Sequence, residues 1–570
     1  MARKELAVDT VAEAYLALLA ERGVEYLFAN AGTDFAPLVE AFAKAARTGM
    51  PVPEPVLATH ENLALSMAHG YAMVTRKVPA VMVHVSVGTA NGVCGVFNAA
   101  RENVPMLFTA GRSPLTEGGL PGARDVYIHW AQEMFDQAGM LREIVKWEYE
   151  LRNGRQLETV IDRALSVATT QPGGPVYLSL PREVLAEPLP GLSFDSPTRR
   201  GAASPPGVDK AAIDEAARIF AAAENPLIVT ASAGRDPAAV EALADFAQRF
   251  AIPVVQHRPR HLCLPADHPS HLGYDAAPLL DSADAILVLE CDVPWVPSLK
   301  APRPECKVIH LGVDPLFSRY PIRGFPCDLA ITGAPAGALP ELGAAVDRHV
   351  IGSKVSERRQ RLAQRREKLL GGWQKTADSA ADMRPIHMAW ASACIARVKP
   401  DDAILVNEYT LMQEHCGSNL AGSYFGSSPA SGLGWGGGAA LGAKLAAPDR
   451  LVIAVLGDGS HLFGNPVAVH HASAMHKLPV LFVVMNNSMW GAVRRATMGM
   501  YPQGEAARSN KPPLIDLDEL PAFEQVCAAA GGYGERVEDP STLPAALERA
   551  IRAVTVEKRQ ALLNVICRGV

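Results

Sequence analysis

The sequence lacks several features that would assign it to other classes of protein. No apolar stretch reaches the roughly 20 residues that a transmembrane helix needs. The nine cysteines include no C-x-x-C pair, so the sequence suggests neither a zinc site nor a disulfide framework. The net charge is −6, and no basic run indicates nucleic-acid binding. Membrane proteins, small disulfide-rich proteins and nucleic-acid binders are therefore disfavoured.

A secretory signal is also missing from the first residues. They read MARKELAVDT and lead directly into a helical pattern. We therefore expect a soluble cytoplasmic protein with reduced thiols. At 570 residues, 48% of them hydrophobic, the chain is long enough for several domains with cores of their own.

The most informative stretch runs from Leu451 to Val493. An apolar run ends at Gly457-Asp458-Gly459, 26 residues follow from Ser460 to Met485, and two asparagines come next at positions 486 and 487. Two adjacent parallel strands would bring Asp458 and Asn487 together at their carboxyl ends, where open α/β sheets bind ligands. An acid, a carboxamide and bare glycine backbone suit Mg²⁺ holding a diphosphate. The alternative is a βαβ turn with an incidental aspartate, and the paired asparagines count against it.

This arrangement resembles the cofactor signature of thiamin-diphosphate enzymes. The resemblance implies that Asp458, Asn487 and the backbone carbonyl of Met489 hold the metal. The spacer is slightly longer than is usual in the family, so we expect the loop near 461–465 to be altered.

Residues 1 to about 190 alternate strand and helix signals. Asp9 is the expected cap of the first helix, and strands are expected near 24–29, 55–58, 80–85, 104–110 and 175–180. The segment Ser86–Asn91 is predicted to be a turn of small residues before a helix. The repeated βα order predicts an α/β fold with a doubly wound parallel sheet.

Glu61 lies where a strand gives way to a helix. A glutamate in a first helical turn is ordinarily a favourable partner of the helix dipole. The segment HENLALSMAHGYA, His60 to Ala72, nevertheless fits the pattern around the catalytic glutamate of thiamin-diphosphate enzymes. The resemblance implies that Glu61 hydrogen-bonds N1′ of the cofactor, which leads to the loss of the thiazolium C2 proton.

A Pro-rich stretch, 188–206, separates a second unit, residues 191–350, from the first. It resembles the six-stranded, Rossmann-like central domain of the family, which binds FAD or a nucleotide in some members. No compelling G-x-G-x-x-G is present, so a structural domain with an empty or vestigial nucleotide site is preferred over FAD binding. The charged segment 354–372 predicts a linker helix, with an interaction segment as the alternative.

Three doubly wound parallel-sheet domains follow from this reading. They are a pyrimidine-binding domain at 1–190, a central Rossmann-like domain at 191–350 and a diphosphate-binding domain at 376–570, with a linker helix at 351–375 before the last. The first and third units look like related sheets. In the family the two cooperate across a subunit interface, so we expect a homo-oligomer, at least a dimer and usually a tetramer.

Three segments resemble the benzoylformate decarboxylase branch of the family most closely: HVSVGTAN at 84–91, VKWEYEL at 145–151 and GPVYLSLP at 174–181. The resemblance implies that His84 handles protons and that Thr33 contacts the substrate carboxylate. A strand-end histidine bonded to backbone is the alternative for His84. Gln132 resembles a glutamine of acetolactate synthases and is a candidate for the same side of the active site as His84.

Two departures from that branch leave the substrate open. No histidine occurs near 295–297, where the decarboxylase has a second one, and Ala496 stands where a bulky aromatic would be. Leu433 matches the apolar wedge that bends the cofactor. The full set of expected cofactor-binding residues is Glu61, Asn91, Thr410, Ser431, Leu433, Gly457, Asp458, Gly459, Ser460, Asn487, Met489, Trp490 and Gly491.

The expected activity is that of a thiamin-diphosphate- and Mg²⁺-dependent decarboxylase or carboligase. By resemblance, it acts on a 2-ketoacid or a related C–C substrate through an ylid and an enamine. Alternatives are an acetolactate synthase-like transferase, a flavin-binding 2-ketoacid oxidase, and a non-catalytic nucleotide-binding regulatory protein. The intact Glu61, Asp458 and Asn487 argue against the last.

Overall fold

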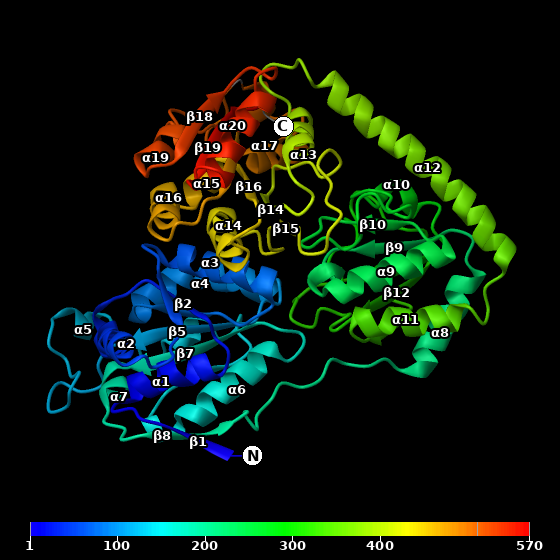
Figure 1. Cartoon of the computed structure of the whole chain (residues 1–570). Coiled ribbons are helices and arrows are strands. Elements are labelled where there is room, and N and C mark those ends of the chain that lie inside the picture. Colours follow the sequence, from blue (N-terminus) through cyan, green and yellow to red (C-terminus); the bar gives the residue numbers. More distant parts are fainter. Residues whose placement is uncertain (1, 510, 569–570) are drawn as a thin grey trace.

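The computed structural model describes residues 2–509 and 511–568 and contains three parallel sheets with helices packed on their faces (Figure 1). A small antiparallel pair, β1 (Ala2–Leu6) with β8 (Leu192–Ser196), lies beside the first sheet. Among the described residues, no helix is both long enough and apolar enough to cross a membrane. The fold is α/β with parallel sheets, as the sequence predicted.

The first sheet has six parallel strands. In spatial order they are β3 (Glu54–Leu57), β2 (Tyr26–Ala29), β4 (Ala80–Val83), β5 (Met106–Arg112), β7 (Pro175–Pro181) and β6 (Glu148–Glu150). The helices packed around it include α1 (Val11–Glu21), α2 (Ala36–Thr48), α3 (Glu61–Thr75), α4 (Val85–Arg101) and α6 (Leu157–Thr169). Strand β4 is buried throughout, as expected for a parallel strand covered on both faces.

The third sheet repeats this order. Its strands are β15 (Tyr424–Gly426), β14 (Ile404–Glu408), β16 (Val452–Gly457), β17 (Leu481–Asn486), β19 (Ala561–Ile566) and β18 (Tyr533–Val537). Its helices include α13 (Met388–Val398), α14 (Trp435–Ala446), α15 (Asp458–Phe463), α16 (Pro466–Met475), α17 (Gly491–Met500), α19 (Phe523–Ala529) and α20 (Leu543–Thr555). Numbered along the chain, the strands of both sheets follow the order 2-1-3-4-6-5, so the expected likeness of the two sheets is present.

The central sheet has five strands rather than the expected six. They are β10 (Val254–Gln256), β9 (Pro226–Thr230), β11 (Ala285–Leu289), β12 (Lys307–Gly312) and β13 (Leu329–Thr332), with α8 (Lys210–Ala222), α9 (Pro237–Phe250) and α11 (Pro335–Val346) packed around them. At the β10 edge, the segment 270–273 runs parallel to the strand but forms only a single bridge, between His271 and Val254. It is too short to count as a sixth strand.

Helices α3 and α14 occupy equivalent places, each following the second strand of its sheet, and they pack closely against each other (Figure 1). Glycines allow this approach. A Cβ on Gly70 would come within 2.0 Å of the carbonyl oxygen of Ala439, and one on Gly442 within 1.9 Å of that of Met67. A Cβ on Gly438 would meet the Ser66 side chain at 2.6 Å. One hydrophobic cluster therefore runs from the first unit into the third.

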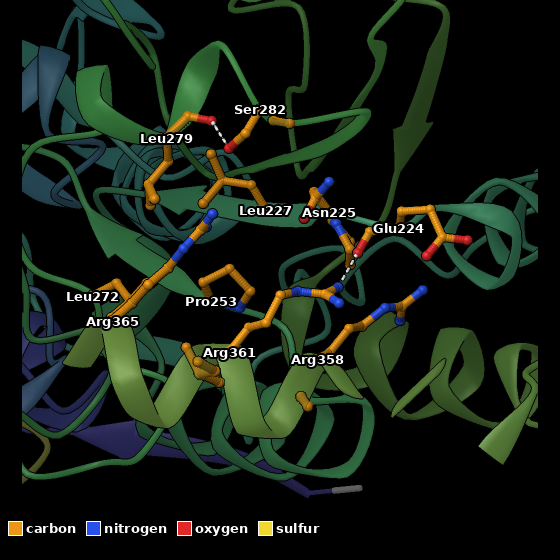
Figure 2. A pocket seen from close by; sticks show the side chains of 14 residues that line it. Glu224, Asn225, Leu227, Pro253, Leu272, Leu279, Ser282, Arg358, Arg361 and Arg365 are labelled. Carbon is orange, nitrogen blue, oxygen red and sulfur yellow. Dashed lines mark hydrogen bonds between the residues drawn. The ribbon is translucent and has the colours of Figure 1, made fainter. Parts of the chain in front are cut away.

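Helix α12 (Gly352–Ser379) runs along the outside of the central unit toward the third (Figure 1). Arg358 donates to the carbonyl of Ala223, and Arg361 donates to that of Glu224 at 3.0 Å. Both carbonyls follow the end of α8, where the helix dipole favours positive charge. Figure 2 shows the pocket between α12 and the central unit, whose cavity of about 30 Å³ has room for about two water molecules.

Two local expectations from the sequence are wrong. The cap of α1 is Thr10, whose hydroxyl accepts the N–H of Glu13, whereas the Asp9 carboxylate pairs with Lys44. The segment Ser86–Asn91 is not a turn but lies in the first two turns of α4. Its small residues have modest helix propensity, and the packing of α4 against α3 and β5 overrides it.

Candidate active site

Asp458 and Asn487 lie at the same edge of the third sheet. Strands β16 and β17 are adjacent and parallel, with Gly457 opposite Met485. Asp458 is the first residue of α15, and Asn487 directly follows β17. The predicted meeting of the acid and the carboxamide at neighbouring strand ends is therefore present.

The Asp458 carboxylate is buried and only half satisfied. The residue is 3% exposed, and its Oδ1 accepts the N–H of Gly459 at 2.7 Å. Its Oδ2 is buried without a hydrogen-bond partner among the described residues. Burial raises the pKa of Asp458, and the backbone N–H groups of Gly459 and of residues 487–489 offset the lost hydration only in part. A bound divalent cation would satisfy this oxygen, so the residue fits a metal.

The turn after β17 supplies the other oxygen donors. The Asn487 Oδ1 accepts the N–H of Met489 at 3.1 Å, and Ser488 between them has a positive φ of 54°. The Trp490 ring covers Gly459, where a Cβ would lie 2.5 Å from the ring. Within the described residues no group of three or more His, Cys, Asp or Glu side chains could hold a metal. A set with one carboxylate, one carboxamide and a carbonyl is consistent with that finding and suits Mg²⁺.

Polar groups and glycines around Asp458 suit a diphosphate. The Thr410 Oγ1, which follows β14, is buried without a partner among the described residues. Ser460 is buried in α15, and Gly457 lies next to the methyl group of Thr410. Gly491 begins α17 beside the Asn487 side chain. A phosphate-binding loop needs hydroxyl groups and backbone N–H groups that no side chain covers.

The glycine-rich segment before α14 is held against α4 of the first unit. Asn98 donates to the Gly432 carbonyl at 2.9 Å and accepts the Gly432 N–H at 3.0 Å. The neighbouring Ser431 has a positive φ of 57°, and Leu433 is half-buried. The predicted wedge residue is thus anchored by the first unit rather than left on a free loop.

Glu61 is buried at the beginning of α3, 9% exposed, as the sequence predicted for its position. Its Oε2 accepts a short hydrogen bond from the Asn91 carboxamide of α4. Gly88 of α4 lies beside the carboxylate, and a Cβ there would be 3.4 Å from Oε1, an ordinary contact. Asn91 itself is exposed, so the Glu61 site opens onto the surface of the chain.

His84 and Gln132 are brought together at the end of β4. The Gln132 Nε2 lies 3.2 Å from the His84 Nε2, and the Ser86 hydroxyl donates to the Gln132 carbonyl at 2.7 Å. The other ring nitrogen of His84 lies 2.6 Å from Asp34. Thr33 directly precedes Asp34 and is exposed. No hydrogen bond of the described residues joins this cluster or Glu61 to Asp458 or Asn487.

Two buried acids at strand ends had no role in the sequence interpretation. Asp34 follows β2, and Glu408 ends β14. Glu408 accepts the N–H groups of Gly434 at 2.8 Å and Gly436 at 2.7 Å, at the beginning of α14. Burial raises the pKa of Glu408 to about 7. The sequence does show each acid within or just after an apolar strand. It does not show what the acid binds, because the partners of both acids lie far along the chain.

A cavity of about 200 Å³ lies between the first and central units, at the carboxyl ends of β9 and β11. Its lining includes Ser232, Arg235 and Glu290, and Arg235 lies 3.6 Å from Glu290. Pockets for drug-sized ligands usually measure about 300–1,000 Å³. The cavity is therefore smaller than an enclosed dinucleotide requires.

Fold and site together define an α/β enzyme with two related sheets, one carrying a buried glutamate and the other a metal-type carboxylate. Three family models match successive parts of the chain. They are the N-terminal thiamine pyrophosphate binding domain at residues 9–140, the central domain at 213–342 and the C-terminal binding domain at 407–565. The chain belongs to the thiamine pyrophosphate enzyme family, and its binding domains are those for thiamin diphosphate.

Relatives of this chain include benzoylformate decarboxylases and acetolactate synthases. The chain is 27% identical to benzoylformate decarboxylase of Pseudomonas aeruginosa, over 98% of this chain and 99% of that one. It is 24% identical to the acetolactate synthase large subunit of Haemophilus influenzae, over 95% and 91%. The crystal structure of benzoylformate decarboxylase from Polynucleobacter necessarius superposes with a TM-score of 0.79 at 21% identity and covers 99% of both chains. The last comparison supports the fold alone.

Proposed function

We propose that this chain is a thiamin-diphosphate- and Mg²⁺-dependent lyase that decarboxylates a 2-ketoacid, or a carboligase for a related C–C substrate. The observation that carries the proposal is the buried, half-satisfied Asp458 carboxylate beside Asn487 at adjacent strand ends. A buried anion without a partner is costly unless a cation joins it. The similarity to benzoylformate decarboxylase supports the choice of substrate class.

Asp458, Asn487 and the Met489 carbonyl would hold Mg²⁺ against the diphosphate, with Thr410 and Ser460 as hydroxyl donors. Bound thiamin diphosphate supplies a carbon nucleophile and an electron sink for C–C bond cleavage. Trp490 and Leu433 would bound the cofactor on its apolar side. The roles of these residues are proposals.

Glu61 would share a proton with N1′ of the aminopyrimidine, and Asn91 orients the Glu61 carboxylate through its hydrogen bond. His84 would hold or donate the proton that the reacting carbon or oxygen exchanges, with the Gln132 carboxamide beside its Nε2. Thr33 would bind the substrate carboxylate from the exposed turn after β2.

We infer that at least two copies make the active assembly, and we propose a tetramer as its full form. Asn91 beside Glu61 is exposed in the single chain, as is Val87 in the same helix. Phe463, at the end of the Asp458 helix, is 57% exposed, and Val467, in the next helix, is 67% exposed. Apolar side chains of this kind around two incomplete half-sites suit a subunit interface.

The acetolactate synthase relatives keep a second candidate open, a transferase that joins a 2-ketoacid to an acceptor. The half-buried Gln132 at His84 suits either reaction. A flavin-binding oxidase is less well supported, because the cavity at the central sheet is small. A non-catalytic nucleotide-binding protein would have no use for the Glu61–Asn91 pair.

The test is CO₂ release from a panel of 2-ketoacids with added thiamin diphosphate and Mg²⁺. Acceptor aldehydes and ketones are added in parallel to detect carboligation, and Glu61→Gln serves as the inactive control. We expect release from at least one 2-ketoacid that the control lacks. Cofactor retained on the protein without any turnover across the panel would overturn the proposed reaction. A visible flavin absorption band in the purified protein would favour the oxidase.

A further inference from the structure

We propose that Asp34 is the positioning residue of His84: it fixes the ring tautomer and aims the Nε2 of His84 at the reacting site. This inference rests on the proposed function for its consequence in turnover. The pairing itself is a property of the protein without cofactor or substrate, so the two can be tested separately.

Asp34 and His84 come from the ends of neighbouring strands. Asp34 lies in the short helix η1 (Thr33–Phe35) that follows β2, and His84 is the residue between β4 and α4. Strands β2 and β4 pair in parallel, so both residues emerge at the same edge of the sheet. The Asp34 Oδ1 lies 2.6 Å from the His84 Nδ1, and the Asp34 Oδ2 accepts the Val85 N–H at 3.4 Å.

Two glycines make room for this pair, and the need is one of space rather than of backbone conformation. A Cβ on Gly32 would lie 2.2 Å from the His84 Nδ1, and a Cβ on Gly111 would lie 1.7 Å from the Asp34 Oδ2. Gly32 has an extended φ of −131°, and Gly111 is not among the residues with positive φ. Glycine at both positions is therefore explained by the room that the carboxylate and the ring occupy.

The pairing determines which ring nitrogen carries the proton. Asp34 is 3% exposed and its carboxylate can only accept, so the His84 Nδ1 must donate. In the neutral ring the Nε2 is then a free base. That nitrogen faces Gln132, whose Oε1 is buried without a partner among the described residues. The carboxamide can donate to the neutral ring, and after a flip it can accept from the protonated one.

Neighbouring charges are already paired with one another. Glu133, next to Gln132, pairs with Arg112 and Arg124 at 2.8 Å each. Arg182 pairs with Asp125 and also approaches the Thr33 carbonyl at 3.5 Å. Asp34 is thus the carboxylate that contacts the ring, and its removal would leave the Nδ1 without its acceptor.

The experiment measures the tautomer directly. Magic-angle-spinning ¹⁵N spectra of histidine-labelled full-length protein, free of cofactor, separate protonated from unprotonated ring nitrogens. The His84 signals are assigned by difference from His84→Gln. We expect the Nδ1–H tautomer in the wild type and its loss in Asp34→Asn, because the Val85 N–H takes the carboxamide oxygen and leaves the NH₂ group to donate to Nδ1. A wild-type ring in the Nε2–H form, or an unchanged tautomer in Asp34→Asn, would overturn the proposal.

Kinetics give the second readout. In Asp34→Asn, kcat with the best substrate should fall by about 10²-fold, no more than on loss of His84 itself, while KM and cofactor affinity stay near the wild type, since only proton handling is lost. The matched control is Asp162→Asn, which removes another buried carboxylate, paired with Arg22 at 2.6 Å and distant in role. That control should keep kcat within about threefold of the wild type. The loss in Asp34→Asn would then not be a general effect of removing a buried carboxylate.

A second variant perturbs the pair while both Asp34 and His84 keep their side chains. Gly111→Ala would push the Asp34 carboxylate away from the ring, so it should reproduce the tautomer change and the drop in kcat. A tautomer change without any 2-ketoacid turnover in the wild type would refute the proposed function and leave the pairing intact. Turnover in the wild type with an unchanged tautomer in both variants would refute the pairing alone.

Discussion

The first and third sheets share one strand order, yet they present different chemistry at corresponding positions. Beyond the first strand, the first sheet carries Asp34, and the first strand of the third sheet ends at Glu408. After the third strand come His84 and Asp458 respectively. In the first sheet the acid and the histidine bind each other, whereas in the third the Asp458 Oδ2 is buried and has no hydrogen-bond partner in the part of the chain that the structure describes.

The difference shows that the residues at the strand ends, rather than the fold, decide what each half does. A paired acid and base suit proton transfer, and a half-satisfied carboxylate among glycines suits a cation and a phosphate. Both sets occupy the carboxyl edge that parallel sheets offer to ligands. Substitutions that remove one half at a time therefore test whether the other half still works.

The largest expected effect is that of Asp458→Ala on the third sheet. Loss of the charged ligand should lower thiamin-diphosphate affinity in Mg²⁺ buffer by more than about 100-fold, the upper range for loss of a mere supporting partner of a metal site. Asn487→Ala should be milder, because a neutral ligand is lost rather than a charge. Calorimetric titration measures both, and unchanged affinity in Asp458→Ala would remove the metal assignment.

Glu61→Gln breaks the first sheet while sparing the third. Cofactor should still bind through Asp458 and Asn487, but exchange of the cofactor's C2 proton with D₂O should slow by about 10²–10⁴-fold, because the carboxamide cannot exchange the proton. The exchange is followed by NMR after acid quench. Exchange at the wild-type rate would show that Glu61 only begins a helix.

His84→Ala separates the two tasks within the first sheet. C2 proton exchange and cofactor affinity should stay near the wild type, whereas turnover of the best substrate should fall by about 10²-fold, the lower range for a general acid or base. Gln132→Ala removes only the neighbour of the His84 Nε2, so it should lower turnover by less than His84→Ala does. A loss below about threefold in His84→Ala would make His84 a structural residue.

Glu408 affects stability rather than cofactor binding or turnover, since burial raises its pKa from 4.5 to about 7. The unfolded chain releases this proton near pH 4.5 and the folded chain only near pH 7, so its contribution to the free energy of unfolding falls as the pH rises between these values. The fall amounts to about 3 kcal/mol. Chemical denaturation at pH 4.5 and pH 7 should show it as a difference between wild type and Glu408→Gln. The same pH dependence in both proteins would contradict it.

The sequence was sufficient for features that depend on local pattern. Uninterrupted apolar runs marked β16 and β17, and the acid and asparagines after them fell at one edge because parallel neighbours end together. Glu61 begins α3 as its motif predicted. The Ser460 hydroxyl and the Met489 carbonyl proposed around Asp458 belong to the segment 451–493, whereas Thr410 follows β14.

Features that depend on distant contacts were not predictable. Asp34 needs His84, 50 residues further along, and the two glycines that give the pair room. The start of α4 was placed too late because tertiary packing outweighs the weak propensity of Ser86 to Asn91. Thr10 and Asp9 are both good cap residues, and the competing Lys44 decides between them.

The close approach of α3 and α14 constrains how this chain can vary over evolution. At Gly70, Gly438 and Gly442 even one added methyl group meets the opposite helix, twice at a backbone oxygen that cannot move aside. A lone substitution at these places forces the helices apart and disturbs Glu61 at the start of α3 together with the loop before α14. Substitutions at this contact therefore have to occur together on both helices. The two halves of the site consequently evolve together.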